Sequence, residues 1–465
     1  MLFRKELRKI CFSFVYVLYL GLLLFSWHHN FRGVTGKEIS ASQGKGTSAA
    51  EEMMGGSILE KPEKNAGSYG SKKKEDPEKI MRGGTDWLIT EYLKNSYAAY
   101  PFTYYKEVVL SEEEQKEVLN IIEEITGLTE AQIHHLPDGY FPVVNGNIIH
   151  FYDEGAVQDA DGSFSFEAGE SDTGKDTEDH TEHFISQVSY ERFKELMSEM
   201  EHIVGAGSTY SMDMLTEYYG QVEMTYEEAM EEYSKTINDD KVSTAFARLF
   251  CDYMTRALGL YPVFIAVVFW MKDRHNRMNE LIDSRQIGTA KFICIRFSAM
   301  LTAVLIPVIL FSFESLIPLL IYSADTGIAV DPFAFLKYIL WWLLPTAMIV
   351  TALGMFLTIF TSSPAAVLVQ SAWWFVDSAV TGLSGDVRWY TLMIRHNLLT
   401  GSEIIRQNLA VICLNRGLLM LASILLLWLS VILYDKKRGG RLEYGHAVRK
   451  YRRLLKERCS ACFQK

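Results

Sequence analysis

Cysteine is scarce in this chain and is absent from its long polar middle. The six cysteines lie in or beside apolar stretches or among the last residues: Cys11, Cys251, Cys294, Cys413, Cys459 and Cys462. If the polar middle folds outside a cell, it does so without disulfides and needs a conventional hydrophobic core. Cys459 and Cys462 form a single CxxC without the second pair of a four-cysteine zinc site, so their role is open.

A nucleotide-binding motif is also missing. The nearest approach is QGKGTS at residues 43–48, which lacks the first glycine of a phosphate-binding loop and follows no predicted strand. No nucleophile, base and metal ligands converge in the sequence either. We therefore expect that the chain is not an enzyme and that it holds no metal and no cofactor of its own.

Basic residues are few in the polar middle. Between residues 85 and 245, roughly 35 acidic residues stand against about 8 basic ones, within a chain of net charge −11. Cytosolic loops of membrane proteins are enriched in Lys and Arg. We therefore expect this region to be extracellular, and we expect no nucleic-acid partner.

Long apolar runs are what the sequence has in abundance. About 20 helical residues suffice to cross the roughly 30 Å of bilayer hydrocarbon. Six runs are of about this length: residues 10–27, 247–271, 292–322, 333–360, 364–383 and 409–434. The sequence thus predicts an α-helical polytopic membrane protein with six transmembrane helices and an α+β extracellular domain between the first and the second.

The remaining stretches complete the predicted domain organisation. Residues 29–84 are rich in Gly, Ser, Lys and Glu and predict a flexible linker. In the extracellular domain, Ser111 and Glu114 predict a capping box before a helix, and residues 137–155 predict a hairpin. The predicted parts are residues 1–28 (N-terminus and first helix), 29–84 (linker), 85–245 (extracellular domain), 246–434 (five-helix domain with a cytosolic loop at 272–291) and 435–465 (basic tail).

The distribution of basic residues predicts the topology. Lys and Arg crowd residues 1–9, 272–296 and 436–465, whereas the loop 322–332 has none. Both termini are therefore expected in the cytosol of a cell-membrane protein, with residues about 29–245 outside. The basic tail is expected to lie against anionic lipid or a partner protein.

The loop at residues 272–291 is charge-rich and helix-prone. Within NELIDSRQI (residues 279–287), two apolar residues, Leu281 and Ile282, are flanked by charged ones. A short surface helix of this kind can dock into a groove of a partner. A solvated turn that merely connects two helices would have the same composition, so the pattern alone leaves both possibilities open.

This loop resembles the first cytoplasmic loop of ABC-transporter permeases of the type-2 export class. That loop has the form E-L-[LI]-x-[ST]-x-x-[IV]-[SG]-x-x-x-[FIL], and the matching residues are Glu280, Leu281, Ile282, Ser284, Ile287, Gly288 and Phe292. Gln286 departs from the usual proline, and Ala290 replaces the glycine that commonly precedes the lysine at Lys291.

The resemblance implies a function for the loop. It would form a coupling helix that seats on a separate ATPase subunit, through Asn279, Glu280, Leu281, Ile282, Ser284, Arg285, Ile287 and Gly288. ATP would be bound by that subunit, two permease and two ATPase chains would form the complex, and short helices would enter the outer leaflet between the last two spans. The expected function is a permease subunit of an ATP-driven exporter. The alternative is a membrane-anchored sensor or assembly protein with a ligand-binding extracellular domain, and the sequence identifies no substrate.

Charged residues that lie deep inside apolar runs are candidates for a functional or structural role, and we single out Glu314, Asp377 and Arg416. Counted at about 1.5 Å per residue from the predicted outer ends, each is roughly 9 to 12 Å deep. A lone charge at mid-membrane costs about 2.5–3.5 kcal/mol, so such residues usually pair or face a cavity. We expect Arg416 to pair with Asp377 or Glu314 near the outer gate, either as a structural link or as a contact for the substrate.

Overall fold

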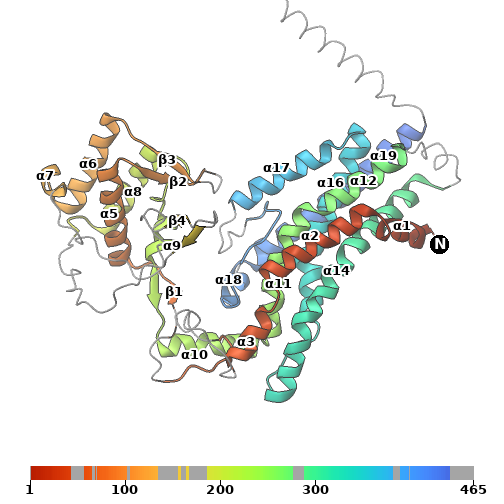
Figure 1. Ribbon diagram of the computed structural model, residues 1–465, viewed down its shortest axis with the longest axis horizontal. Helices are drawn as coiled ribbons and strands as arrows, with labels where there is room; N and C mark the ends of the chain where they lie inside the picture. Colours follow the sequence, from red (N-terminus) through yellow and green to blue (C-terminus); the bar gives the residue numbers. More distant parts are fainter. Residues whose placement is uncertain are drawn as a thin grey trace, which may run out of the picture. The chain divides into compact units, whose positions relative to one another are not determined.

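Figure 1 shows the computed structural model of the chain. It describes residues 2–42, 57–64, 69, 71–101, 105–134, 156–158, 164–166, 186–275, 287–380, 388–396 and 398–439. The chain divides into two compact units. Residues 1–65 and 226–465 form one, the membrane unit, and Ala66–Thr225 form the other, the polar unit.

Helices dominate the described part of the membrane unit (Figure 1). Its first half contains α1 (Leu2–Cys11), α2 (Phe14–Asn30), α3 (Val34–Ser42), α10 (Tyr226–Ser234), the π-helical η3 (Lys235–Asp239), α11 (Ser243–Leu260) and α12 (Pro262–His275). Its second half contains α14 (Thr289–Thr326), α15 (Ala334–Tyr338), the π-helical η4 (Ile339–Leu343), α16 (Leu344–Thr361), α17 (Ala365–Val380), α18 (Ser402–Gln407) and α19 (Leu409–Arg438).

Several of these helices are long and apolar enough to cross a membrane. Four qualify alone: Ser243–Asp273, Thr289–Thr326, Ala334–Thr361 and Leu409–Arg438. The pair Leu2–Cys11 and Phe14–Ser42, bent by 65°, qualifies as one span, which makes up to five within the described residues. The chain is therefore a membrane protein. The described α17 has only 16 residues, about 24 Å, so the sixth predicted span stays a prediction.

Helix α16 is enclosed by other helices of the bundle. It packs against α12, α14, α17 and α19. A Cβ on Gly354 would lie 2.9 Å from the Cβ of Ala266 in α12, closer than such atoms come. Small residues at interfaces are what lets membrane helices approach one another closely. Gly354 therefore sets the distance between α12 and α16.

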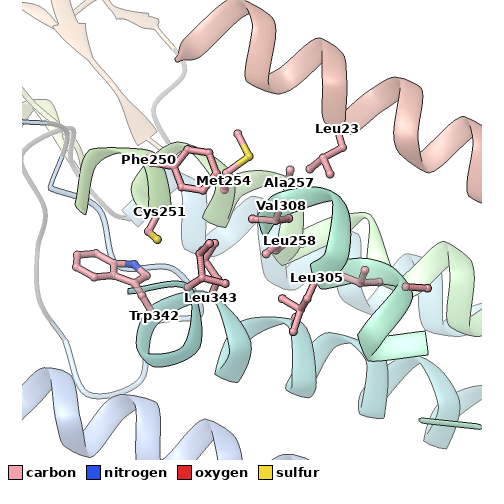
Figure 2. Close-up of a cluster of buried hydrophobic side chains, with 14 of the residues drawn as sticks. Leu23, Phe250, Cys251, Met254, Ala257, Leu258, Leu305, Val308, Trp342 and Leu343 are labelled. Atoms are coloured by element: carbon pink, nitrogen blue, oxygen red, sulfur yellow. The ribbon is translucent and has the colours of Figure 1, made fainter. Parts of the chain in front are cut away.

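The core of the membrane unit lies where α2, α11, α14 and η4 meet. Figure 2 shows Leu23, Met254, Val308 and Leu343 from these four elements around one cluster of buried side chains. Many other apolar side chains of α14 and α19 remain exposed. An apolar surface of this kind is expected where helices face lipid.

The bundle has two ends, which we call the loop end and the segment end. At the loop end, α12 ends before residues 276–286 and α14 begins after them. Helix α1 also contacts this end, since Lys9 Nζ donates to Asp273 Oδ1 at 3.0 Å. At the segment end, the non-helical residues Thr391–His396 are buried and contact α11, α17 and α19. Helices α12 and α17 connect these two ends.

The polar unit is mostly helical in its described residues. It contains α5 (Pro77–Lys94), α6 (Glu112–Thr126), α7 (Glu130–Ile133), α8 (Tyr190–Val204) and α9 (Met212–Tyr219). Its strands have three residues each and form three antiparallel pairs: β1 (Ser71–Lys73) with β6 (Gln221–Glu223), β2 (Tyr97–Ala99) with β3 (Lys106–Val108), and β4 (Ala156–Gln158) with β5 (Phe164–Phe166). The predicted α+β character therefore stays a prediction.

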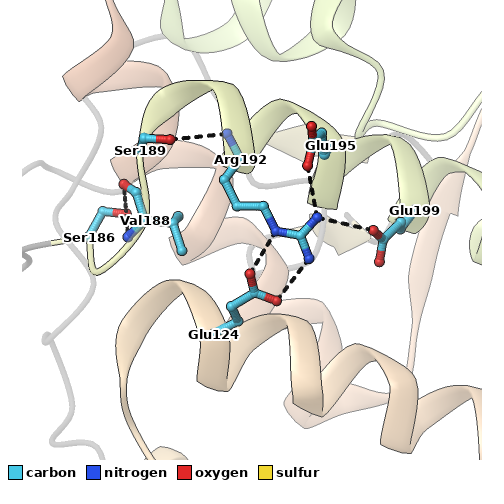
Figure 3. A network of polar contacts seen from close by, with 7 residues as sticks. All are labelled: Glu124, Ser186, Val188, Ser189, Arg192, Glu195 and Glu199. Atoms are coloured by element: carbon cyan, nitrogen blue, oxygen red, sulfur yellow. Dashed lines mark hydrogen bonds and ion pairs between the residues drawn. The ribbon is translucent and has the colours of Figure 1, made fainter.

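Local sequence signals explain the start and the packing of helix α6. The predicted capping box is confirmed, since Glu114 N donates to Ser111 Oγ and Ser111 N donates to Glu114 Oε2. Its buried face joins a core with α5 and α8, which includes Ile122 and Phe193. At the surface, Arg192 Nε of α8 lies 2.7 Å from Glu124 Oε1 of α6 (Figure 3).

The folded parts differ from two of the predicted boundaries. Helix α3 and the first turns of α5 fall within residues 29–84, which the sequence predicts as a linker. Asp76 caps α5 and Pro77 starts it, so this start signal outweighs the polar composition of the stretch. The predicted extracellular domain ends at 245, whereas the polar unit ends at Thr225. The predicted hairpin at 137–155 lies outside the described residues.

Candidate functional site

The structure describes the two roots of the predicted coupling loop. Asn279, Glu280, Leu281, Ile282, Ser284 and Arg285 lie outside the described residues, as do Cys459 and Cys462. Ile287 and Gly288 are described, and Gly288 is the N-cap of α14. The Ile287 carbonyl accepts a hydrogen bond from Arg438 Nη1 of α19 at 2.8 Å. The loop is therefore attached to α19 as well as to its flanking helices.

Arg296 connects the two roots of the loop. This side chain of α14 is 1% exposed, and its Nη1 lies 2.7 Å from Asp273 Oδ2 of α12. Arg296 Nη2 donates to the Phe269 carbonyl at 2.6 Å, and the guanidinium lies 4.5 Å from the ring centroid of Trp270. A guanidinium held by an ion pair, a hydrogen bond and an aromatic face has little freedom to move.

Two further links join other helices to the same end. Lys9 of α1 lies 3.0 Å from the other carboxylate oxygen of Asp273. Thr289 Oγ1 of α14 donates to Asp435 Oδ1 of α19 at 2.9 Å. We call Lys9, Asp273, Thr289, Arg296, Asp435 and Arg438 the loop-end cluster. It ties α1, α12, α14 and α19 together around the roots of the loop.

The predicted buried charges meet through a peptide group. Arg416 donates to Asn415 Oδ1, to the Trp342 carbonyl, to Thr346 Oγ1 and to the Leu392 carbonyl. None of these four acceptors is a carboxylate. Asp377 accepts from the backbone N–H groups of Leu392 and Met393, at 2.8 and 2.9 Å. The expected pair of Arg416 and Asp377 is therefore bridged by Leu392.

Glu314 lies in another part of the membrane unit. Its Oε1 accepts from the backbone N–H of Gly33 at 3.2 Å, and Ser315 Oγ donates to its Oε2. Gly33 has a positive φ of 80° and stands between α2 and α3. Glu314 thus fixes the turn that follows the first span, and the structure does not bring it to Arg416.

The Thr391–His396 segment is a stretch of non-helical chain held by side chains. All six residues are buried. Asn415 Nδ2 donates to the Thr391 carbonyl at 2.8 Å, and Trp342 Nε1 of η4 donates to the Ile394 carbonyl at 3.3 Å. Non-helical backbone is tolerated within a membrane only where protein or a water-filled cavity satisfies its polar groups. These side chains do so for this segment.

A second buried ion pair fixes the other end of the segment. Asp252 of α11 is fully buried, and its Oδ1 accepts from Arg395 Nε while its Oδ2 accepts from His396 N at 2.6 Å. One turn earlier in α11, Arg248 Nη2 lies 3.0 Å from Asp240 Oδ2 and donates to the Leu399 carbonyl at 2.8 Å. The charged groups therefore hold the loop between α17 and α19 against α11.

Sequence reasoning missed Asp252, Arg248 and Arg395. Residues 247–271 were predicted only as an apolar span, with no charge singled out within it. The available signal was the stretch ARLFCDYMTR (residues 247–256), in which three charged residues stand among apolar ones. Charges in such a stretch usually have partners, and the arginine that completes the pair lies more than a hundred residues away.

The contacts at both ends hold chain segments in place. At the loop end, helices are linked to helices, and at the segment end, helices are linked to buried backbone. No protein-family model, no curated protein and no solved structure matches this chain.

Proposed function

We propose that this protein is the membrane-spanning permease subunit of an ATP-driven ABC transporter, most simply an exporter. The loop at 272–291 would receive the movement of a separate ATPase subunit, which binds the ATP. Six spans, cytosolic termini and an outer domain between the first two spans complete the proposal. A second permease chain would form the other half of the complex.

The directions of the helices support six spans. Lys437, near the end of α19, donates to Ser362 Oγ just after α16 at 2.9 Å, so both helices end at the loop end. The chain between them must therefore travel to the segment end and return through α19. Helix α17 leads from the loop end to the segment end, because it begins near Ser362 and its Asp377 accepts a hydrogen bond from Leu392 N. In the proposed topology the loop end is cytosolic.

The observation that carries the proposal is the attachment of the loop to four helices. A force on residues 276–286 acts on α12 and α14, which Arg296 and Asp273 join at 2.7 Å. It also acts on α1 through Lys9 and on α19 through the contact of Arg438 with Ile287. A loop that only connected two helices would not need this reinforcement. Small shifts at such a site can move packed helices together.

Co-purification tests the proposal. The tagged full-length chain would be purified from its native membrane in mild detergent, and its partners identified by mass spectrometry. We expect an ATPase with Walker motifs, lost when Leu281→Asp places a charge on the docking face. Val109→Asp, at a residue of the polar unit that is 68% exposed, is the matched control and should retain the ATPase. Absence of an ATPase, or its retention by Leu281→Asp, would contradict the proposal.

The alternative of a sensor is favoured by one observation. The polar unit has its own hydrophobic core, which includes Ile122, Phe193 and Met197, as expected of a domain that can fold on its own. A sensor would keep its partners when Leu281→Asp is introduced and lose them when the polar unit is deleted. The same purification with a chain lacking residues 66–225 therefore separates the two functions.

A further inference from the structure

Helix α1 is a short N-terminal helix that turns away from the first span (Figure 1). It is about 15 Å long and is bent by 65° from the helix that follows it. Ser13 fixes the bend, because its Oγ donates to the Ile10 carbonyl at 2.7 Å and accepts from Tyr16 N at 3.2 Å. Since membrane spans are tilted by only about 20° on average, α1 lies closer to the plane of a membrane crossed by α2 than to its normal.

One side of α1 is docked on the bundle. The helix packs along α14, and its Ile10 is fully buried. Glu6 Oε2 lies 4.0 Å from Arg296 Nε of α14, and Lys9 Nζ lies 3.0 Å from Asp273 Oδ1 of α12. This side of α1 therefore belongs to the fold, and the opposite side is left for a partner.

The opposite side carries three exposed cations, Arg4, Lys5 and Arg8. Arg4 precedes Arg8 by four residues and Lys5 precedes it by three, so the three side chains share one face of the helix. Among the residues that the structure describes, none of the three has a hydrogen bond or an ion pair, whereas Lys9 pairs with Asp273. We call these three residues the cationic face of α1.

Exposed apolar side chains continue from the cationic face onto the first span. Phe12 is 83% exposed and follows Arg8 by one turn, and its ring centroid lies 5.7 Å from the Arg8 guanidinium. Phe14, which is 80% exposed, and Leu18 come next on α2. Aromatic rings are enriched at the boundary between the headgroups and the hydrocarbon of a bilayer. The surface therefore changes from charged to apolar where α1 meets the span.

This order of charge and apolar surface fits an anionic phospholipid. A phosphate at headgroup level can accept from the guanidinium groups of Arg4 and Arg8, and Lys5 adds a third positive charge. The acyl chains would then lie beside Phe14 and Leu18 on α2. A protein partner could also cover the cations, but the apolar part of the surface belongs to a span, and the exposed side of a span faces lipid.

We propose that the cationic face of α1 binds the phosphate groups of anionic phospholipids, with Phe12 and Phe14 inserted among their acyl chains. Helices that lie in a membrane interface combine a basic face with large apolar side chains in this way. The proposal goes beyond the transport function, since a bound lipid needs no ATPase. Through Lys9 and Asp273, the same helix is attached to the loop end. In the proposed topology the lipid belongs to the cytosolic leaflet.

Hydrogen exchange of α1 in two lipid mixtures tests the proposal. The full-length chain would be reconstituted without other proteins in nanodiscs of phosphatidylcholine, alone or with a minor fraction of phosphatidylglycerol, and residues 2–11 followed by mass spectrometry. With phosphatidylglycerol we expect exchange at least about fivefold slower, the factor for one cation beside an anionic surface. The triple variant Arg4→Gln, Lys5→Gln, Arg8→Gln should exchange equally in the two mixtures.

Two further variants separate the cationic face from the rest of the helix. Lys9→Gln removes a positive charge from the docked side of the same helix, and it should keep the difference between the two mixtures. Phe12→Ser removes an exposed ring and should speed exchange in both mixtures, because less of the helix is inserted. If the triple variant does not elute as a single species, Arg4→Gln alone should still reduce the difference.

Four results would overturn the proposal. The first is equal exchange of the wild type in the two mixtures, and the second is a difference that survives in the triple variant. The third is equal slowing by inorganic phosphate in phosphatidylcholine alone, because a soluble anion would then be the ligand. The fourth is slowing only after an ATPase is added, which would assign the cationic face to a protein partner.

Discussion

Buried carboxylates are held in opposite ways in the two units. In the membrane unit, Asp240, Asp252 and Asp273 each contact an arginine that is at most 3% exposed. In the polar unit, Asp86 and Glu91 of α5 are also buried, but no ion pair involves them among the described residues. Glu91 instead accepts from Tyr210 Oη at 2.6 Å and from Ala98 N at 2.9 Å.

The difference shows what each carboxylate contributes. In the polar unit, burial raises the pKa of Asp86 and that of Glu91 to about 7, because the lost hydration outweighs the nearby charge of Arg82 at Asp86 and the hydrogen bonds at Glu91. In the membrane unit, the cations of two of these pairs also bind backbone, as Arg296 binds the Phe269 carbonyl and Arg248 the Leu399 carbonyl, and in the third pair Asp252 itself accepts from His396 N. Paired charges therefore link helices in one unit, whereas in the other the carboxyl groups respond to pH.

Removal of Asp252 should have the largest effect. Asp252→Leu leaves Arg395 buried without its counter-charge and His396 N without its acceptor, which typically costs about 3–5 kcal/mol. We expect a strongly lowered midpoint in thermal unfolding of the detergent-solubilised protein, followed by tryptophan fluorescence. Asp239→Leu, at the exposed pair with Arg406, is the control and should change the midpoint little. Equal midpoints for the two variants would contradict a structural role for the buried pair.

The pH dependence of the polar unit should be the next largest effect. Asp86 and Glu91 have folded pKa values near 7 and unfolded values near 4, so the folded unit binds more protons between these pH values. The contribution of these two groups to the free energy of unfolding is therefore greatest below pH 4 and falls as pH rises through 7, by at most roughly 4 kcal/mol per carboxyl. Hydrogen exchange of residues 77–94, corrected for intrinsic rates, should be faster at pH 8 than at pH 5.

Replacement of Glu91 should reduce that pH dependence. Glu91→Gln removes a group that must be charged at high pH and keeps an oxygen that can accept from Tyr210. The variant should exchange more slowly than the wild type at pH 8 and similarly at pH 5. An unchanged difference between the two pH values would mean that Glu91 does not titrate in this range.

Removal of Lys9 should have the smallest effect of these changes. Its side chain is 38% exposed, and Arg296 keeps Asp273 paired in its absence. Lys9→Ala should therefore lower the stability by less than about 1 kcal/mol, as is typical of solvent-exposed pairs. A loss of stability as large as that of Asp252→Leu would show that α1 stabilises the membrane unit more than its contacts indicate.

The apolar runs and the start signals of helices made much of the fold predictable. Five predicted spans match helices or a helix pair of sufficient length, because runs of about 20 apolar residues leave a helix few alternatives. The start of the helix capped by Ser111 was also predicted, since its capping residues act locally.

The partners of buried charges could not be predicted in the same way. Asp377 and Arg416 were found because they interrupt apolar runs, yet their meeting point at Leu392 depends on a non-helical segment without a periodic pattern. The pair of Asp252 and Arg395 joins residues 143 positions apart. Such contacts are set by the packing of helices, which a single sequence does not specify.

Hydrogen exchange of the complex with its ATPase tests the central claim most directly. If the loop receives movement and the loop-end cluster passes it on, addition of ATP should change exchange at residues 388–396 as well as at 272–291. Asp273→Ala should keep the change at 272–291 and lose the change at 388–396, because it breaks the link from Arg296 to α12. A change confined to 272–291 in the wild-type complex would contradict the account.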